Sequence, residues 1–160
     1  MILRPVAAAD FARVRTVTEA AFGRPDEAGM IEAVRAENRV LVEIVADAEC
    51  GIVGHILFSR LSAEPAALIA GLAPLSVTPA RQRRGFGAAL ARRGLEECRA
   101  LGAVGCVVLG SPAYYGRFRF ARAPANIECR FAPLDAFQAL AFGPNAFARP
   151  IRLAYPAAFD

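Results

Sequence analysis

Apolar positions in the first part of the chain recur with helical spacing. From Asp10 to Phe22 they return every three or four residues, which predicts a helix with Asp10 as its N-cap. The segment Gly23-Arg24-Pro25 ends this helix. A second helix is expected from Pro25 to Arg35, because a proline and two acidic residues occupy its first turn. A short strand from Ile2 to Val6 is expected before both helices.

The pattern then changes to that of β-strands. Val40 to Asp47 and Gly51 to Leu61 are rich in β-branched and apolar residues, and the short segment between them predicts a hairpin. A third run of this kind, Leu68 to Val77, contains a proline. Because proline removes a hydrogen-bond donor from the ladder, we expect this strand to be bulged near Ala73-Pro74.

A strand–helix–strand unit follows the bulged strand. An apolar stripe at spacings of three and four runs from Phe86 to Leu101, opposite a face of arginine and glutamate, which predicts an amphipathic helix. Val104 to Leu109 is continuously apolar, as buried parallel strands are. We therefore expect a βαβ unit inside a larger mixed sheet. The other predicted elements are a helical segment at 112–118, a strand at 126–131, a short helix at 135–141 and a last strand at 148–155.

Length and composition favour one globular domain. The chain has 160 residues, of which 56% are hydrophobic and 21% charged, so it does not resemble a disordered chain. We treat residues 1–160 as a single domain in which residues 126–160 complete the sheet and the substrate side. The longest charge-free stretch, Pro65 to Ala80, is interrupted by prolines and is shorter than the ~20 apolar residues of a membrane-spanning helix. Membrane partners are therefore not expected.

No metal site is expected. Cys50, Cys98, Cys106 and Cys129 are widely spaced and His55 is the single histidine, so the ligand spacing of a zinc site is missing. We expect reduced thiols in a cytoplasmic protein, and the amino terminus lacks the pattern of a signal peptide. All 19 basic residues are arginine, and the net charge of +4 is compatible with an anionic partner without identifying one.

The strongest chemical signal lies where the bulged strand leads into the helix. Gly85 and Gly87 are placed so that the first-turn amides are free and not shielded by side chains. Free N–H groups at the positive end of a helix dipole bind anions, and a pyrophosphate group fits such a site. Arg81, Arg83 and Arg84 supply charge for further phosphates.

Other interpretations of this turn fit less well. A dinucleotide fingerprint needs a third glycine where Leu90 stands, and a P-loop needs a lysine, which the chain lacks. An RNA-recognition strand would continue with stacking aromatics, but Ala88 and Ala89 follow Gly87, so nucleic acid is not an expected partner. A glycine-containing helix start with a solvated arginine face remains the structural alternative.

At this point the chain resembles a known family. Val77-x-Pro79, followed by Gln82-x-x-Gly85-x-Gly87, is similar to the acetyl-coenzyme A signature of the GNAT N-acetyltransferases. The segment from Tyr115 to Phe120 is similar to the family's Tyr-x-x-x-Gly-Phe, although Arg119 stands where glycine is usual. The resemblance implies a mixed α/β fold. Its central twisted sheet would be mostly antiparallel, contain one parallel βαβ unit and be splayed at the cofactor site.

The resemblance also implies a cosubstrate and an activity. Acetyl-CoA would donate its acetyl group directly to an amine, without an acyl-enzyme and without a metal. The backbone of the bulged strand would pair with the pantetheine arm, and a free N–H there would polarise the thioester carbonyl. Tyr115 would be the general acid for the leaving thiolate, while Tyr114 is expected to point elsewhere. The residues implied for cofactor binding are Leu75, Ser76, Val77, Gln82, Arg83, Arg84, Gly85, Phe86, Gly87, Ala88 and Ser111.

The general base is not assigned by the sequence. Many relatives have a glutamate on the strand before the turn, but the segment from Ile69 to Pro74 has no ionisable group. His55 is the candidate base, with Glu43, Ser111 and a water chain as weaker alternatives. The acceptor, a small molecule or a protein amine, stays open, as does a homodimer. The missing glutamate and Arg119 favour the alternative function, a non-catalytic module that binds CoA or another phosphorylated ligand.

Overall fold

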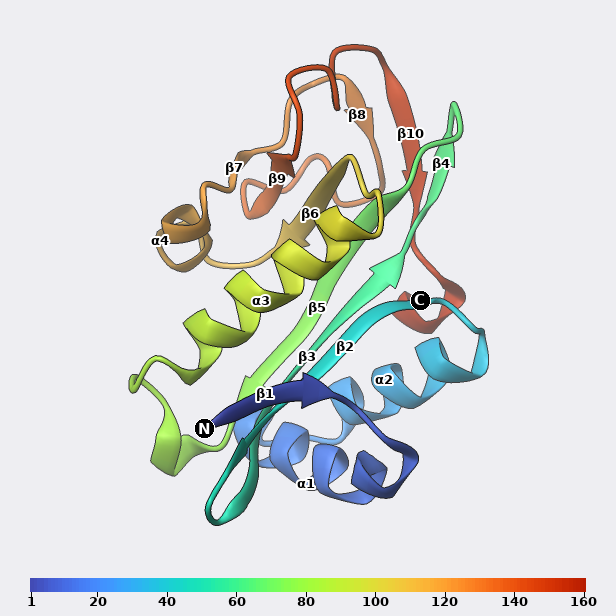
Figure 1. The fold of residues 1–160 in the computed structure, drawn as a ribbon. Helices are drawn as coiled ribbons and strands as arrows, with labels where there is room; N and C mark the ends of the chain where they lie inside the picture. Colours follow the sequence, from blue (N-terminus) through green and yellow to red (C-terminus); the bar gives the residue numbers. More distant parts are fainter.

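The computed structural model describes residues 1–160, which form two β-sheets and four α-helices (Figure 1). The elements are β1 (Ile2–Pro5), α1 (Phe11–Phe22), α2 (Asp26–Ala36), β2 (Val40–Ala48), β3 (Gly51–Arg60), β4 (Ser62–Glu64), β5 (Ile69–Val77), α3 (Phe86–Ala100), β6 (Gly105–Leu109), α4 (Pro112–Tyr115), β7 (Ala121–Arg122), β8 (Ile127–Glu128), β9 (Phe137–Ala141) and β10 (Ile151–Ala154). Four 3-10 turns are η1 (Ala8–Asp10), η2 (Pro79–Arg81), η3 (Gly116–Phe118) and η4 (Ala157–Phe159). No helix is long and apolar enough to cross a membrane.

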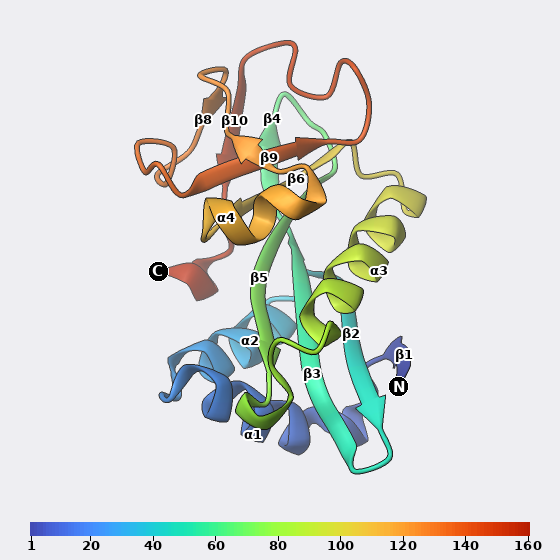
Figure 2. The same cartoon turned by 90° about the vertical axis from the view of Figure 1, so that its left-hand side faces the viewer.

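The main sheet has the strand order β1-β2-β3-β5-β6-β9-β7. Only β5 and β6 pair in parallel within it, so the expected sheet, mostly antiparallel with one βαβ unit, is confirmed. Helices α1 and α2 cover one face and α3 covers the other (Figure 2). Apolar side chains of β2 and β3 point to both faces, so each face has its own core.

The carboxyl-terminal part of the fold differs from expectation. Residues 135–141, predicted as a short helix, contain strand β9, which pairs with β6 on one side and β7 on the other. Phe137, Gln138 and Ala139 are buried there, so pairing and burial outweigh the local preference of an alanine-containing segment. Within residues 126–160, only β9 completes the main sheet. Strands β8 and β10 instead form a second sheet with β4, a strand that was not predicted.

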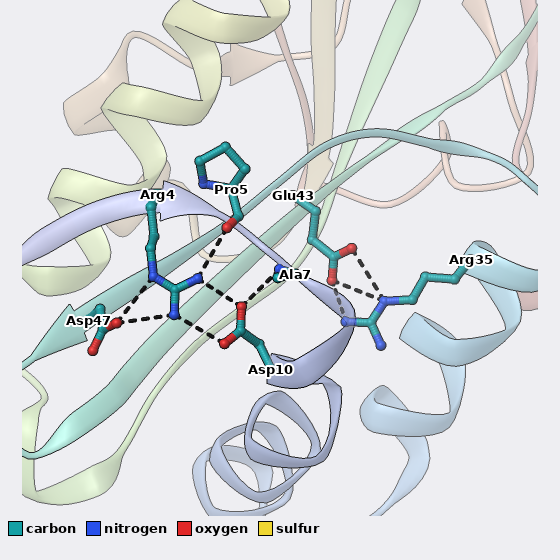
Figure 3. Close-up of polar contacts among 7 residues, drawn as sticks. All are labelled: Arg4, Pro5, Ala7, Asp10, Arg35, Glu43 and Asp47. Atoms are coloured by element: carbon teal, nitrogen blue, oxygen red, sulfur yellow. Dashed lines mark hydrogen bonds and ion pairs between the residues drawn. The ribbon is translucent and has the colours of Figure 1, made fainter.

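An arginine holds the amino-terminal elements together (Figure 3). The Arg4 guanidinium donates to Asp47 of β2 at 3.0 and 3.1 Å, and to Asp10 at 2.8 and 3.0 Å. Asp10 also accepts from the backbone N–H of Ala7 at 2.8 Å. Asp10 is the N-cap residue of α1, as predicted, but its side chain makes no capping hydrogen bond to that helix. Its carboxylate binds Arg4 instead, and the hydrogen bond from Arg4 lowers the pKa of Asp10 to about 2.

The sheet opens between β5 and β6. The two strands pair from Ile69 opposite Gly105 to Leu72 opposite Val108, and beyond Leu72 strand β5 continues with β3 alone. At the point of divergence Ala73 and Pro74 lie opposite a single residue of β3, which confirms the predicted bulge. The edge of β5 that faces β6 is therefore free of a partner strand from Ala73 to Val77.

Candidate active site

A cavity of about 800 Å³ lies at this opening in the sheet. One part of its wall comes from the start of α3 and from α4, and another part comes from α2 and the carboxyl-terminal η4. Helices α2 and α3 cover opposite faces of the sheet (Figure 2), and both contribute residues to the cavity wall.

The turn before α3 has a run of free backbone donors. None of the amides from Arg83 to Ala88 donates a hydrogen bond to another backbone group. Arg83 (φ +59°) and Gly85 (φ +88°) are both left-handed, and the side-chain amide of Gln82 donates to the carbonyl of Val77 at 3.0 Å. These features hold the turn open at the positive end of the α3 dipole, as an anion site requires.

Most of the predicted cofactor residues surround the cavity, and three do not. The members that line it are Leu75, Val77, Gln82, Arg83, Gly85, Gly87, Ala88 and Ser111. Ser76 is buried on the side of α1, where its hydroxyl lies 3.2 Å from that of Thr18, so only its backbone is available to a ligand at the β5 edge. Arg84 is exposed and Phe86 packs on the core below α3; neither side chain lines the cavity.

Both tyrosines of α4 line the cavity. The Tyr114 hydroxyl lies against Gly87, 2.7 Å from where a β-carbon would be, so the expectation that Tyr114 points elsewhere is wrong. The Tyr115 ring lies beside Gly110 and packs edge-on against Phe120, with ring centroids 5.9 Å apart. Burial raises the pKa of Tyr115, so its hydroxyl is protonated at neutral pH, as a general acid must be.

The turn after α4 accounts for the unusual arginine of the Tyr115–Phe120 segment. Arg119 has φ +72°, in the left-handed region that glycine adopts at little cost. The backbone therefore keeps the conformation that a glycine would supply, although the side chain is present. Phe118 and Phe120 on either side are buried, which anchors this turn to the core.

His55 is not placed to act as a base. It is fully buried in β3 on the face covered by α1 and α2, and it is not part of the cavity wall. Its Nε2 lies 2.7 Å from a carboxylate oxygen of Glu43, and burial lowers the pKa of His55. Burial also raises the pKa of Glu43, but hydrogen bonds from His55 and Arg35 outweigh it and hold this pKa below its ordinary value. Figure 3 shows the hydrogen bonds from Arg35. Of the candidate bases, only Ser111 lines the cavity, and its Oγ accepts from the N–H of Tyr114 at 3.3 Å.

The structure adds an acidic residue that sequence reasoning missed. Glu27 is the only carboxylate in the cavity wall, and its side chain is 13% exposed. It accepts from Nε of Arg24 at 3.0 and 3.1 Å. In the sequence it is simply an acid in the first turn of a predicted helix, and nothing local indicates that this turn faces a cavity. No group of three or more His, Cys, Asp or Glu side chains is arranged to hold a metal ion.

The family model described as acetyltransferase (GNAT) matches residues 11–118, which include the bulged strand β5, the turn before α3 and both α4 tyrosines. This chain belongs to the GNAT family. The match ends at Phe118. It therefore includes the cavity-wall residues of α2, β5, α3 and α4, but not the carboxyl-terminal ones, Phe131, Tyr155 and Phe159.

Individual GNAT proteins are similar over nearly the whole chain. A GNAT acetyltransferase from Brucella melitensis, solved in complex with acetyl-CoA, is 39% identical, with a TM-score of 0.84 over 99% of this chain and 97% of that one. YhbS from Escherichia coli, described as an uncharacterized N-acetyltransferase, is 28% identical over 142 residues, 86% of this chain and 85% of YhbS. The solved structure of YhbS with CoA has a TM-score of 0.90 over 99% of this chain and 91% of that one, at 24% identity.

Proposed function

We propose that this GNAT protein transfers the acetyl group of acetyl-CoA directly to an amine. The observation that carries the proposal is the run of free amides from Arg83 to Ala88 beside the opened edge of β5, at the wall of one cavity. The GNAT structure from Brucella melitensis in complex with acetyl-CoA supports the identity of the donor.

The cosubstrate would be bound mainly by backbone groups. The pyrophosphate accepts hydrogen bonds from the turn amides, with Arg83 and Arg117 at the cavity wall available for further phosphate charge. The pantetheine arm pairs with the open edge of β5 beyond Leu72, as an added strand would. This pairing brings the thioester to the bulge, where a backbone N–H of β5 would polarise its carbonyl; Pro74 has no N–H, so the donor would be a neighbouring residue of the strand.

The chemical step then needs an amine and an acid. The unprotonated amine attacks the thioester carbonyl, forming the C–N bond and a tetrahedral oxyanion. The C–S bond breaks as the oxyanion collapses, and the Tyr115 hydroxyl gives its proton to the leaving thiolate. The proton lost by the amine passes to water in the open cavity, because the β5 segment before the turn carries no ionisable side chain.

Two measurements test the proposal. Calorimetric titration with acetyl-CoA measures donor binding, and release of free thiol in the presence of an amine panel measures transfer. We expect tight donor binding and thiol release that depends on the amine. Donor binding without release for any amine would instead support the non-catalytic module. Absence of donor binding would overturn the proposed transfer and would leave only a module for another phosphorylated ligand.

A further inference from the structure

The cavity has a second arm that the proposed donor does not use. Its wall lies on the α2 side of the opening and combines one ion pair with apolar residues from both ends of the chain. This part of the wall includes Arg24, Glu27, Phe131, Tyr155 and Phe159. If the donor occupies the phosphate turn and the β5 edge, this arm is the space left for the acceptor. The inference below therefore rests on the proposed acetyl transfer.

Three aromatic rings form a continuous apolar surface in this arm. The ring centroids of Phe131 and Tyr155 are 5.0 Å apart, and those of Tyr155 and Phe159 are 4.9 Å apart. Phe22, at the end of α1, lines the same cavity and is 40% exposed. Such a surface stabilises a ligand with an aromatic or branched aliphatic body, because binding removes apolar area of both partners from water.

The charges of this arm are balanced. Glu27 is the only carboxylate in the whole cavity wall, and it is paired with Arg24. The other two cations of the wall are Arg83 and Arg117, and both lie near the turn that would bind the phosphates. Arg83 is part of that turn. The Arg117 guanidinium lies 4.5 Å from the ring centroid of Tyr114, and the Tyr114 hydroxyl contacts Gly87 at the start of α3. A ligand with several positive charges would meet one carboxylate and three guanidinium groups in this cavity, so its additional charges would be repelled.

Glu27 retains the capacity to bind one ammonium group. An ionised carboxylate has about four lone-pair sites. Arg24 donates to both oxygens of Glu27 through Nε and to Oε1 through Nη2, and no other side chain of the protein donates to Glu27. The hydrogen bond from Arg24 lowers the pKa of Glu27, so the carboxylate is ionised at neutral pH. The Arg24 side chain is 60% exposed, whereas that of Glu27 is mostly buried.

We propose that the acceptor is a primary monoamine with an aromatic or branched aliphatic body, bound with its ammonium group on Glu27 and its body against Phe131, Tyr155 and Phe159. Glu27 is a positioning residue in this proposal. It binds the ammonium group and holds it at the opening, where the ammonium loses one proton to water in the cavity before the free amine attacks the thioester. The aromatic surface selects for the apolar body. A polyamine or a lysine-rich peptide fits neither feature.

A matched amine panel tests the class of acceptor. Phenethylamine has the ammonium group and a ring, ethylamine lacks the ring, spermidine adds charge and phenylalanine adds a carboxylate. We expect kcat/KM, measured by free-thiol release, to be at least tenfold higher for phenethylamine than for the other three. A preference for spermidine, phenylalanine or ethylamine would overturn the proposal.

Two variants test the residues. Glu27→Gln should raise KM for phenethylamine at least tenfold while kcat and KM for acetyl-CoA change less than threefold. Phe159→Ala, next to the carboxyl terminus, should reduce the preference for phenethylamine over ethylamine. Glu32→Gln is the matched control, because Glu32 lies on the same helix and pairs with Arg15 but does not line the cavity. An unchanged KM in Glu27→Gln, or an equal effect in the control, would contradict the role of Glu27.

A binding measurement separates this inference from the proposed function. Calorimetric titration of phenethylamine into the folded protein, with and without CoA, needs no turnover. Binding that is weakened by Glu27→Gln supports the acceptor arm even if no thiol is released. Binding of acetyl-CoA without binding of phenethylamine contradicts the acceptor class and leaves the donor site intact.

Discussion

The hydroxyl of Tyr114 lies 2.7 Å from the position that a β-carbon on Gly87 would occupy. This contact joins α4 to the first turn of α3 directly at the free amides. The Tyr114 ring is itself packed edge-on against Tyr115 and Phe118, with centroids 5.0 and 5.6 Å away. A side chain at position 87 would therefore push the hydroxyl out of place or enter the phosphate site.

Gly87→Val should weaken acetyl-CoA binding by at least ~2 kcal/mol, the order of one lost hydrogen bond to a charged group, or roughly 30-fold in Kd. Calorimetry measures this change. Gly29→Val is the control, because a β-carbon on Gly29 meets nothing within 4 Å. The smaller change Gly87→Ala should be partly rescued by Tyr114→Phe, which removes the nearest atom. Unchanged donor binding in folded Gly87→Val would show that the phosphates bind elsewhere.

Tyr115→Phe should lower kcat by about 10²–10⁴-fold, the usual contribution of a general acid. The ring remains, so packing and the KM for acetyl-CoA should change little. Because burial raises the pKa of Tyr115 above its ordinary value near 10, loss of its proton should not reduce wild-type activity below about pH 10. Tyr114→Phe should keep kcat within about twofold. If Tyr115→Phe also keeps more than about half of the wild-type kcat, the acid is another group.

Arg119→Gly should stabilise the protein. Arg119 is left-handed at φ +72°, which costs a non-glycine residue roughly 1–2 kcal/mol, and the added freedom of glycine in the unfolded chain offsets part of the gain. We expect the free energy of unfolding to rise by about 0.5–1 kcal/mol, measured by urea denaturation. Arg93→Gly, the same change inside α3, should lower it by about 1 kcal/mol. A loss of stability in Arg119→Gly would mean that the side chain makes a favourable contact that outweighs the backbone cost.

The Arg4–Asp10 ion pair should make stability depend on acidic pH. The pKa of Asp10 is lowered to about 2 in the folded protein and lies near 3.9 in the unfolded chain. Its contribution to the free energy of unfolding is therefore complete above about pH 5 and is lost as the pH falls toward 2. Asp10→Asn should lower the Tm at pH 7, and the difference from wild type should disappear near pH 2. Asp135→Asn, at a side chain that is 92% exposed, is the control. A difference in Tm that is the same at pH 7 and pH 2 would rule out the ion pair as its cause.

Features that depend only on residues adjacent in the sequence could be predicted from the sequence alone. The apolar stripe of α3, the two glycines before it and the proline of the bulged strand are local patterns, and each restricts the backbone by its own sterics or hydrogen-bonding capacity. The helix periodicity, the free amides and the bulge follow from these local restrictions. For this reason most of the residues predicted to bind the donor lie in the cavity wall, and their role in binding stays a prediction.

The α2 side of the cavity wall depends on contacts between distant segments. Glu27 reached the cavity wall because α2 packs beside the carboxyl-terminal η4, more than 120 positions later in the chain. Residues 137–141 became a strand because β6 and β7 offered partners, and His55 was buried against Glu43 by the pairing of β2 with β3. Burial and pairing are properties of the neighbours that folding brings together, and no local pattern of apolar and polar residues specifies which neighbours those will be.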